Sequence, residues 1–441
     1  MIAAIVVVFL VGYALIAIEG VTEINKAAIA LLMSVICWTL FAVGGFAGDA
    51  TTEVLERSLG EAGTTLFFLM GAMTIVELVD TYGGFNFVRR VMNTESKKVL
   101  FWRIAIMTAL MSAILDNLTT TIVMLMILGK VVQNPKDVLI YTSMTVIAAN
   151  AGGAFSPIGD VTTIMLWNGK MLSAGGVISM LFLPAVASFV VPGLILQHRL
   201  HGPREKISEE SLKMKKHPFE ARRRERYEVF IVGVGGLCCV PLFHGVTGLP
   251  PFVGILLVVG ILWVLTDIIH KYVKKSSASV SAILGKIDMN TILFFLGILM
   301  AVSVLSEIGV LASLGEWLGD HVGSYYLQTG LIGVLSSVVD NVPLVAATMK
   351  MYPIADAAMV ASDPALAGMV QDGMFWQLLA YCAGVGGSLL IIGSAAGVVA
   401  MGIMHIDFGW YLKNITWVAF LGYIAGILVF FIEKSVLSLL L

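Results

Sequence analysis

Residues 150–163 read N-A-G-G-A-F-S-P-I-G-D-V-T-T, within an apolar segment that runs from 138 to 167. Three glycines and one proline in this stretch weaken or block a continuous helix, so we expect a broken helix over 138–167. The break frees backbone carbonyls as ligands, and polar side chains surround it. These side chains are Asn150, Ser156, Asp160, Thr162 and Thr163. Such an oxygen-rich set suits a hard cation, and Na⁺ or Li⁺ fits it.

The composition places this stretch in a membrane protein. Of the 441 residues, 58% are hydrophobic and only 13% are charged. A soluble domain carries roughly 25% charged residues, so a soluble enzyme is excluded and no enzymatic activity is expected. The net charge of -2 is too balanced for a nucleic-acid-binding protein. The four cysteines lie in apolar segments without C-x-x-C spacing, so neither disulfides nor a metal cofactor are expected.

The apolar segments predict an all-α polytopic membrane protein. A helix needs about 20 apolar residues to cross the hydrocarbon layer. Ten segments meet this requirement: 2–18, 27–47, 64–81, 138–167, 177–197, 229–244, 249–269, 289–311, 374–404 and 415–432. Two further apolar pairs, 100–132 and 326–360, are each interrupted by an Asp-Asn step. We expect these two pairs to form re-entrant hairpins.

One loop sets the expected orientation. Residues 198–227 hold ten Lys and Arg against five Glu, so the positive-inside rule makes 201–227 a basic cytoplasmic linker near anionic lipid. With alternating spans, 23 of the 27 basic residues then lie on the cytoplasmic side.

Three motifs occur in the same order on both sides of this linker. F-F-L at 67 returns at 294, S-x-x-x-D-N at 112 returns at 336, and G-G-x5-G at 152 returns at 386. The chain therefore divides into two halves, 1–200 and 228–441, the second with its broken helix over 374–404. Each half has five spans, an odd number, so we expect an inverted repeat, the architecture of secondary transporters with alternating access. A Walker-type phosphate loop is absent from the sequence.

The polar residues inside the apolar segments are the candidate site. Neither Lys nor Arg occurs in 104–129, 137–169, 287–349 or 351–412, so the acids there are expected to lack a basic partner. A buried carboxylate without such a partner is either protonated or faces a bound cation, which is the chemistry of a cation/proton antiporter. The expected cation- and proton-binding residues are Asp116, Asn117, Asn150, Ser156, Asp160, Thr162, Thr163, Asp340 and Asn341. Among them, Asp116, Asn117, Asp160 and Thr162 are the expected Na⁺ ligands.

Five further residues are expected around this site: Ser112, Glu77, Ser336, Ser388 and Ser394. The four serines either support the site or allow close helix packing. Glu77 is either on a proton path or a structural acid in an ion pair. The second half has Ser394 where the first has Asp160, so we expect the main ion site in the first half. The second half then completes a shared cavity or provides a weaker site.

Four stretches resemble NhaD-type sodium/proton antiporters of the ion transporter superfamily. They are D-N-L-T-T-T at 116–121, the stretch 150–163, D-N-V-P at 340–343 and G-G-S-L-L-I-I-G-S-A-A-G at 386–397. The resemblance implies exchange of Na⁺ or Li⁺ for H⁺ at a bacterial inner membrane, and so a role in pH homeostasis. It also implies a scaffold, a moving transport domain and a homodimer.

Other functions remain open from the sequence. An anion carrier of the same superfamily, for arsenite export or sodium-coupled dicarboxylate transport, has similar broken-helix motifs. An intramembrane aspartyl protease would need a G-x-G-D step, which the Pro157 position does not provide. A passive channel is compatible with the composition, but inverted broken repeats favour alternating access.

Overall fold

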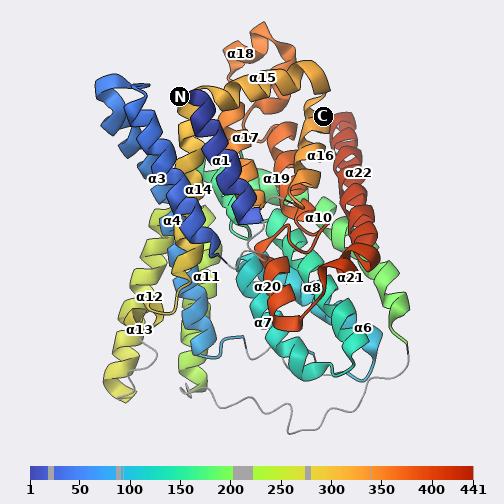
Figure 1. Cartoon of the computed structure of the whole chain (residues 1–441). Helices are drawn as coiled ribbons and strands as arrows, with labels where there is room; N and C mark the ends of the chain where they lie inside the picture. Colours follow the sequence, from blue (N-terminus) through green and yellow to red (C-terminus); the bar gives the residue numbers. More distant parts are fainter. Residues whose placement is uncertain are drawn as a thin grey trace.

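The computed structural model describes residues 1–17, 24–85, 91–92, 94–201, 222–273, 280–338 and 340–440. Within these ranges the chain is built from helices, without strands (Figure 1). Most of the predicted linker, 202–221, lies outside the described residues, as do Arg89 and Arg90.

Seven of the described helices are long and apolar enough to cross a membrane. They are α3 (Lys26–Val43), α4 (Thr51–Thr81, preceded by the short η1, Gly48–Ala50), α10 (Ala174–Leu196, followed by η2, Gln197–Arg199), α11 (Arg223–Thr247), α12 (Pro251–Val273), α14 (Met289–Glu307) and α22 (Thr416–Leu440). Each coincides with a predicted span. The prediction of a polytopic helical membrane protein is therefore confirmed.

The other three predicted spans are shorter or divided helices. The first span is α1 (Ile2–Ala17). The span 138–167 consists of α8 (Pro135–Ala154) and α9 (Val161–Asn168), and the span 374–404 consists of α19 (Met374–Gly386) and α20 (Ala395–Met404). Between the helices the first divided span has Pro157 and Gly159, and the second has Gly387 and Gly393. Gly152 and Gly153, which the sequence also predicts to break the helix, lie inside the last turn of α8.

Each predicted hairpin is a pair of helices that meet at the Asp-Asn step. The first pair is α6 (Lys97–Ser112) and α7 (Asn117–Val131), and the second is α16 (Tyr325–Leu335) and α17 (Asn341–Met351). Asp116 and Asp340 begin the second helix of each pair because their side chains accept hydrogen bonds from its first backbone N–H groups. In Figure 1, α6 and α7 lie at the lower end of the molecule, and α16 and α17 lie at the upper end.

The helices form two groups. In Figure 1, α3, α4, α11, α12 and α14 stand together on the left, and the hairpins and broken helices lie on the right with α10 and α22. The largest packing interfaces lie within these groups, between α10 and α22 and between α14 and α3. Short helices connect the main elements: α13 (Val280–Leu284), α15 (Val310–Val322), α18 (Ala357–Ser362), η4 (Pro364–Met369) and α21 (Phe408–Asn414).

The two halves make the same internal contacts. Ser112 Oγ donates to the Ala149 carbonyl at 2.6 Å, and its counterpart Ser336 Oγ donates to the Ala383 carbonyl at 2.8 Å. Each half also packs against the other in a crossed manner, since α7 contacts α20 and α9 contacts α17. These matched contacts and the opposite placement of the hairpins support the inverted repeat, which remains a prediction.

Close backbone contact depends on one glycine in each broken span. A Cβ at Gly152 would collide with the Ala109 carbonyl of α6, and a Cβ at Gly386 would collide with the Gly333 carbonyl of α16. The hairpin and the broken helix therefore pack backbone to backbone in both halves.

We predict that Gly152→Ala destabilises the protein, because the added methyl must push α8 away from α6. Overpacking of this kind costs about 1–3 kcal/mol. The measurement is the midpoint of thermal unfolding in detergent. Gly60→Ala on α4 is the control, because a Cβ there meets nothing within 4 Å. Equal midpoints for the two variants would contradict the close packing.

Candidate cation-binding site

Asp160 is the most enclosed carboxylate among the predicted site residues. It is 2% exposed and precedes α9, where its Oδ1 accepts a hydrogen bond from the Thr162 backbone N–H at 3.4 Å. Its Oδ2 accepts a hydrogen bond from Asn341 Nδ2 at 3.1 Å, and Asn341 is the first residue of α17. The carboxylate of the first half is thus bound by an amide from the second half.

Asn150 joins a second set of polar groups. It is fully buried on α8, and its Oδ1 accepts from Asn117 Nδ2 at 3.1 Å. Its Nδ2 lies 2.9 Å from both Ser388 Oγ and Ser394 Oγ. Ser394 precedes α20 and accepts from the Gly397 N–H. The Asn150 amide therefore connects the first hairpin to the broken span of the second half.

The repeat relates these two sets of residues to each other. Asp160 corresponds to Ser394, Asn341 to Asn117, and Gly384 of α19 to Asn150, with the same offsets as the motifs. A Cβ at Gly384 would lie 3.5 Å from Asp160 Oδ2. Ser394 thus lies beside the amide side chain of Asn150. Asp160 lies beside Gly384 at the equivalent position, where there is no side chain. Gly384 was not among the predicted site residues, although its offset of 234 from Asn150 identifies it.

Two polar side chains of the break, Thr163 and Ser156, bind its backbone. Thr162 and Thr163 are fully buried, and Thr163 Oγ1 donates to the Asp160 carbonyl at 2.8 Å. Ser156 Oγ accepts from the Ile158 N–H at 3.3 Å inside the break. Ser112 and Ser336 bind carbonyl groups of the broken helices, as described above.

Asp116 is a helix cap whose oxygens both have local partners. Its Oδ1 accepts from the Thr119 N–H at 2.7 Å, and its Oδ2 accepts from Thr119 Oγ1 at 2.6 Å. A role of Asp116 as an ion ligand stays a prediction.

The expectation that Asp340 lacks a basic partner is wrong. Lys26 Nζ lies 3.9 Å from Asp340 Oδ2 and 4.6 Å from the centre of the Phe294 ring. Lys26 begins α3, far in sequence from the intervals without basic residues, and tertiary packing brings it to the start of α17. Asp340 therefore has a positive charge beside it.

Glu77 lies apart from these residues. Its carboxylate is 3.8 Å from Lys286 Nζ, and its side chain is 40% exposed. The contact favours the structural ion pair over the proton path among the two roles predicted for Glu77.

Four helices begin within the connected polar groups, namely α7, α9, α17 and α20. A helix N-terminus carries partial positive charge, which by itself attracts anions. Three of the four caps are aspartates, Asp116, Asp160 and Asp340, and the fourth is Ser394. The negative charges of these carboxylates offset the partial positive charges of the helix N-termini, which favours binding of a cation over an anion.

Comparison with known proteins places the chain in a transporter family. The family model described as "Citrate transporter" matches residues 5–370. The chain belongs to this citrate transporter family. It is also 42% identical over 431 residues to sodium/proton antiporter 1 of Arabidopsis thaliana, covering 96% of this chain and 71% of the relative.

Bacterial relatives and a solved structure agree with this placement. The Na⁺/H⁺ antiporter NhaD of Vibrio cholerae is 30% identical over 459 residues, covering 96% of this chain and 90% of the relative. The resemblance to NhaD-type members of the ion transporter superfamily is thus confirmed. The YdaH transporter of Alcanivorax borkumensis has the same fold, with a TM-score of 0.62, 14% identity and coverage of 93% and 98% of the two chains.

We predict that Asn150→Ala lowers the free energy of unfolding by about 1–3 kcal/mol, because it leaves buried partners without hydrogen bonds. Asn168→Ala is the control, since within the described structure neither atom of the Asn168 amide has a hydrogen-bond partner. Thermal unfolding in detergent measures both. A shift as large for Asn168→Ala would show that the Asn150 hydrogen bonds do not stabilise the fold.

Proposed function

We propose that the protein is a secondary active antiporter that exports Na⁺ or Li⁺ in exchange for H⁺. The observation that carries this proposal is the Asp160 carboxylate, which is buried, bound by the neutral Asn341 amide and flanked by Gly384 instead of a side chain. The Arabidopsis and Vibrio relatives are named as sodium/proton antiporters, which supports the same activity.

The chemistry of Asp160 couples the two ions. An amide donor binds the carboxylate but does not neutralise its charge, so the buried group needs a cation or a proton. When Na⁺ leaves, a proton takes its place on the carboxylate, and Na⁺ binding expels the proton. Thr162 and the backbone of the break, with Asn117 and Asn150 nearby, complete the polar surroundings of the ion.

The second position does not bind an ion in this proposal. Ser394 provides no charge there, and the Asn150 amide already bridges Ser388, Ser394 and Asn117. One exchangeable cation per chain is the consequence.

Alternating access arises from movement between the two helix groups. The hairpins and broken helices carry Asp160, and α3, α4, α11, α12 and α14 form the scaffold.

The protein acts as a homodimer in a bacterial inner membrane, with the linker 201–227 in the cytoplasm, and contributes to pH homeostasis. The charge pattern of the sequence and the resemblance to NhaD-type antiporters support these features.

We predict that Asp160→Asn abolishes Na⁺-driven proton movement in proteoliposomes, because the amide cannot take up the proton and carries no negative charge to exchange between Na⁺ and H⁺. A pH-sensitive dye reports collapse of an imposed pH gradient after addition of NaCl, LiCl or KCl. Asp288→Asn is the matched control, since it also changes a helix cap, at the start of α14, but lies outside the predicted site and keeps an oxygen for the Asn290 and Thr291 N–H groups. We expect the control to retain exchange with Na⁺ and Li⁺.

Exchange by Asp160→Asn at the wild-type rate would reject Asp160 as the ion carrier. One alternative function is an anion carrier. The family description supports it, and so do the N-termini of the helices that begin at the candidate site. Citrate, succinate and arsenite are therefore added in separate experiments. Uptake of one of these anions without any response to Na⁺ or Li⁺ would favour the anion carrier.

A further inference from the structure

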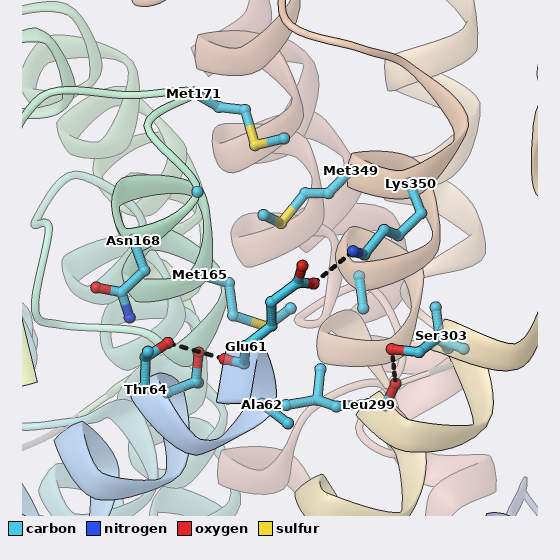
Figure 2. Close-up of a pocket in the computed structure, with 14 residues that line it drawn as sticks. Glu61, Ala62, Thr64, Met165, Asn168, Met171, Leu299, Ser303, Met349 and Lys350 are labelled. Atoms are coloured by element: carbon cyan, nitrogen blue, oxygen red, sulfur yellow. Dashed lines mark hydrogen bonds and ion pairs between the residues drawn. The ribbon is translucent and has the colours of Figure 1, made fainter. Parts of the chain in front are cut away.

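A cavity of about 410 Å³ lies between the two helix groups. Its walls come from α4 and α14 on one side and from the segments around α9 and α17 on the other (Figure 2). The two walls thus belong to the proposed scaffold and to the proposed moving part.

Polar groups face this cavity. Glu61 of α4 reaches across to Lys350 of α17, with 2.6 Å between Oε2 and Nζ (Figure 2). Asn168, at the end of α9, stands on the other side of Glu61, and its amide N and O are buried without a hydrogen-bond partner in the described structure. Thr64 and Ser303 add hydroxyl groups. The Asn168 amide, without a hydrogen-bond partner among the described residues, and the Glu61 carboxylate face the same cavity, and their oxygens are suitable ligands for a partly hydrated monovalent cation.

The cavity is close to the candidate site along two helices. Met165 lines it on α9, five residues after Asp160, or about 7.5 Å along the helix. Ala346 lines it on α17, five residues after Asn341. Val161 and Val342 lie on the same helices between the cavity and the site, and both are buried in one apolar cluster with Ile298 of α14. A thin apolar layer therefore separates the cavity from Asp160.

We propose that this cavity is a vestibule for the transported cation on one face of the membrane, and that Glu61 is its receptor carboxylate. Lys350 acts as a tethered competitor, because an arriving cation takes the place of its ammonium on Glu61. This inference rests on the proposed antiport function. The positive-inside rule predicts that this face is the outer one, because Lys350, Lys170 and Arg57 are among the four basic residues that the alternating spans leave outside the cytoplasmic side.

The exposure of the ion pair allows this exchange. The side chains of Glu61 and Lys350 are 51% and 36% exposed. Ion pairs at such positions are weak and screened by salt, so a cation can replace the ammonium. The pair also links the two helix groups, because Glu61 is on α4 and Lys350 is on α17. Its opening therefore accompanies both cation arrival and movement of α17.

A second ion pair offers a matched control. Arg57 Nη2 lies 2.6 Å from Glu307 Oε1, the same distance as between Lys350 and Glu61. Arg57 is on α4, and Glu307 ends α14, so this pair stays within the scaffold. Neither residue lines the cavity.

The first experiment measures access to the vestibule without measuring transport. Asn168→Cys is made in a chain whose two exposed cysteines, Cys238 and Cys239, are serine. A membrane-impermeant, positively charged thiol reagent is applied from either side of oriented vesicles. We expect labelling from one side only, slowed by NaCl but not by choline chloride, and no slowing by NaCl after Glu61→Gln. Labelling from both sides, or no effect of NaCl, would overturn the vestibule.

The same labelling in an Asp160→Asn chain separates this proposal from the antiport proposal. Protection of Asn168→Cys by NaCl should persist there, because the vestibule lies outside the apolar layer. Loss of protection in Asp160→Asn would reject an independent vestibule site. Protection with no antiport in the parent chain would reject the antiport function and retain the vestibule.

The second experiment measures Na⁺ dependence from each face in proteoliposomes. Glu61→Gln should raise the apparent KM for Na⁺ roughly tenfold from the vestibule face, because the local cation concentration falls. The KM from the opposite face should not change. Lys350→Gln should lower the KM from the vestibule face about two- to fivefold, because the competitor is removed. Glu307→Gln is the control, and a shift equal to that of Glu61→Gln would contradict the proposal.

Discussion

A carboxylate at the start of a half-helix is the constraint on which this structure depends. Asp160 is buried at the start of α9, and the neutral amide of Asn341 on α17 donates a hydrogen bond to its carboxylate. A charge in such a place must be compensated by something that can leave. The broken helices, the hairpins and the crossed packing of the two halves together enclose that carboxylate and bring the Asn341 amide to it.

The repeat supplies two equivalent positions and the substitutions make them unequal. Around Ser394, Asn150 forms hydrogen bonds with Asn117 and with Ser394, so these side chains connect helices of the two halves. In the other, Gly384 removes the side chain that would bridge, and Asp160 replaces the serine. Of the two equivalent positions, the one at Ser394 thus holds a neutral hydrogen-bonded cluster, and the one at Asp160 holds an ionisable carboxylate. The shared contacts of Ser112 and Ser336 with carbonyl groups keep the two geometries alike.

Sequence reasoning located the helices well because the length of an apolar segment is a local property. It also found the two breaks, since glycine and proline act on their own backbone. It misjudged Asp340, because the Lys26 partner is distant in the chain and no periodicity connects them. It also could not distinguish Asp116 from Asp160. Both residues cap helices, and only the packing around them determines that Thr119 occupies the oxygens of one and Asn341 reaches the other.

The sequence by itself determined that this chain is a helical membrane protein with two broken spans, acids within apolar segments and three motifs that occur twice in the same order. These properties depend on composition, spacing and backbone chemistry, which are local. Only the tertiary structure decided which acid is enclosed, which one stands beside a lysine, and that Glu61 meets Lys350 across a cavity. The physical reason is that burial and charge pairing depend on side chains that approach from other helices. The contact of α4 with α17, for example, joins Glu61 and Lys350, which are 289 positions apart.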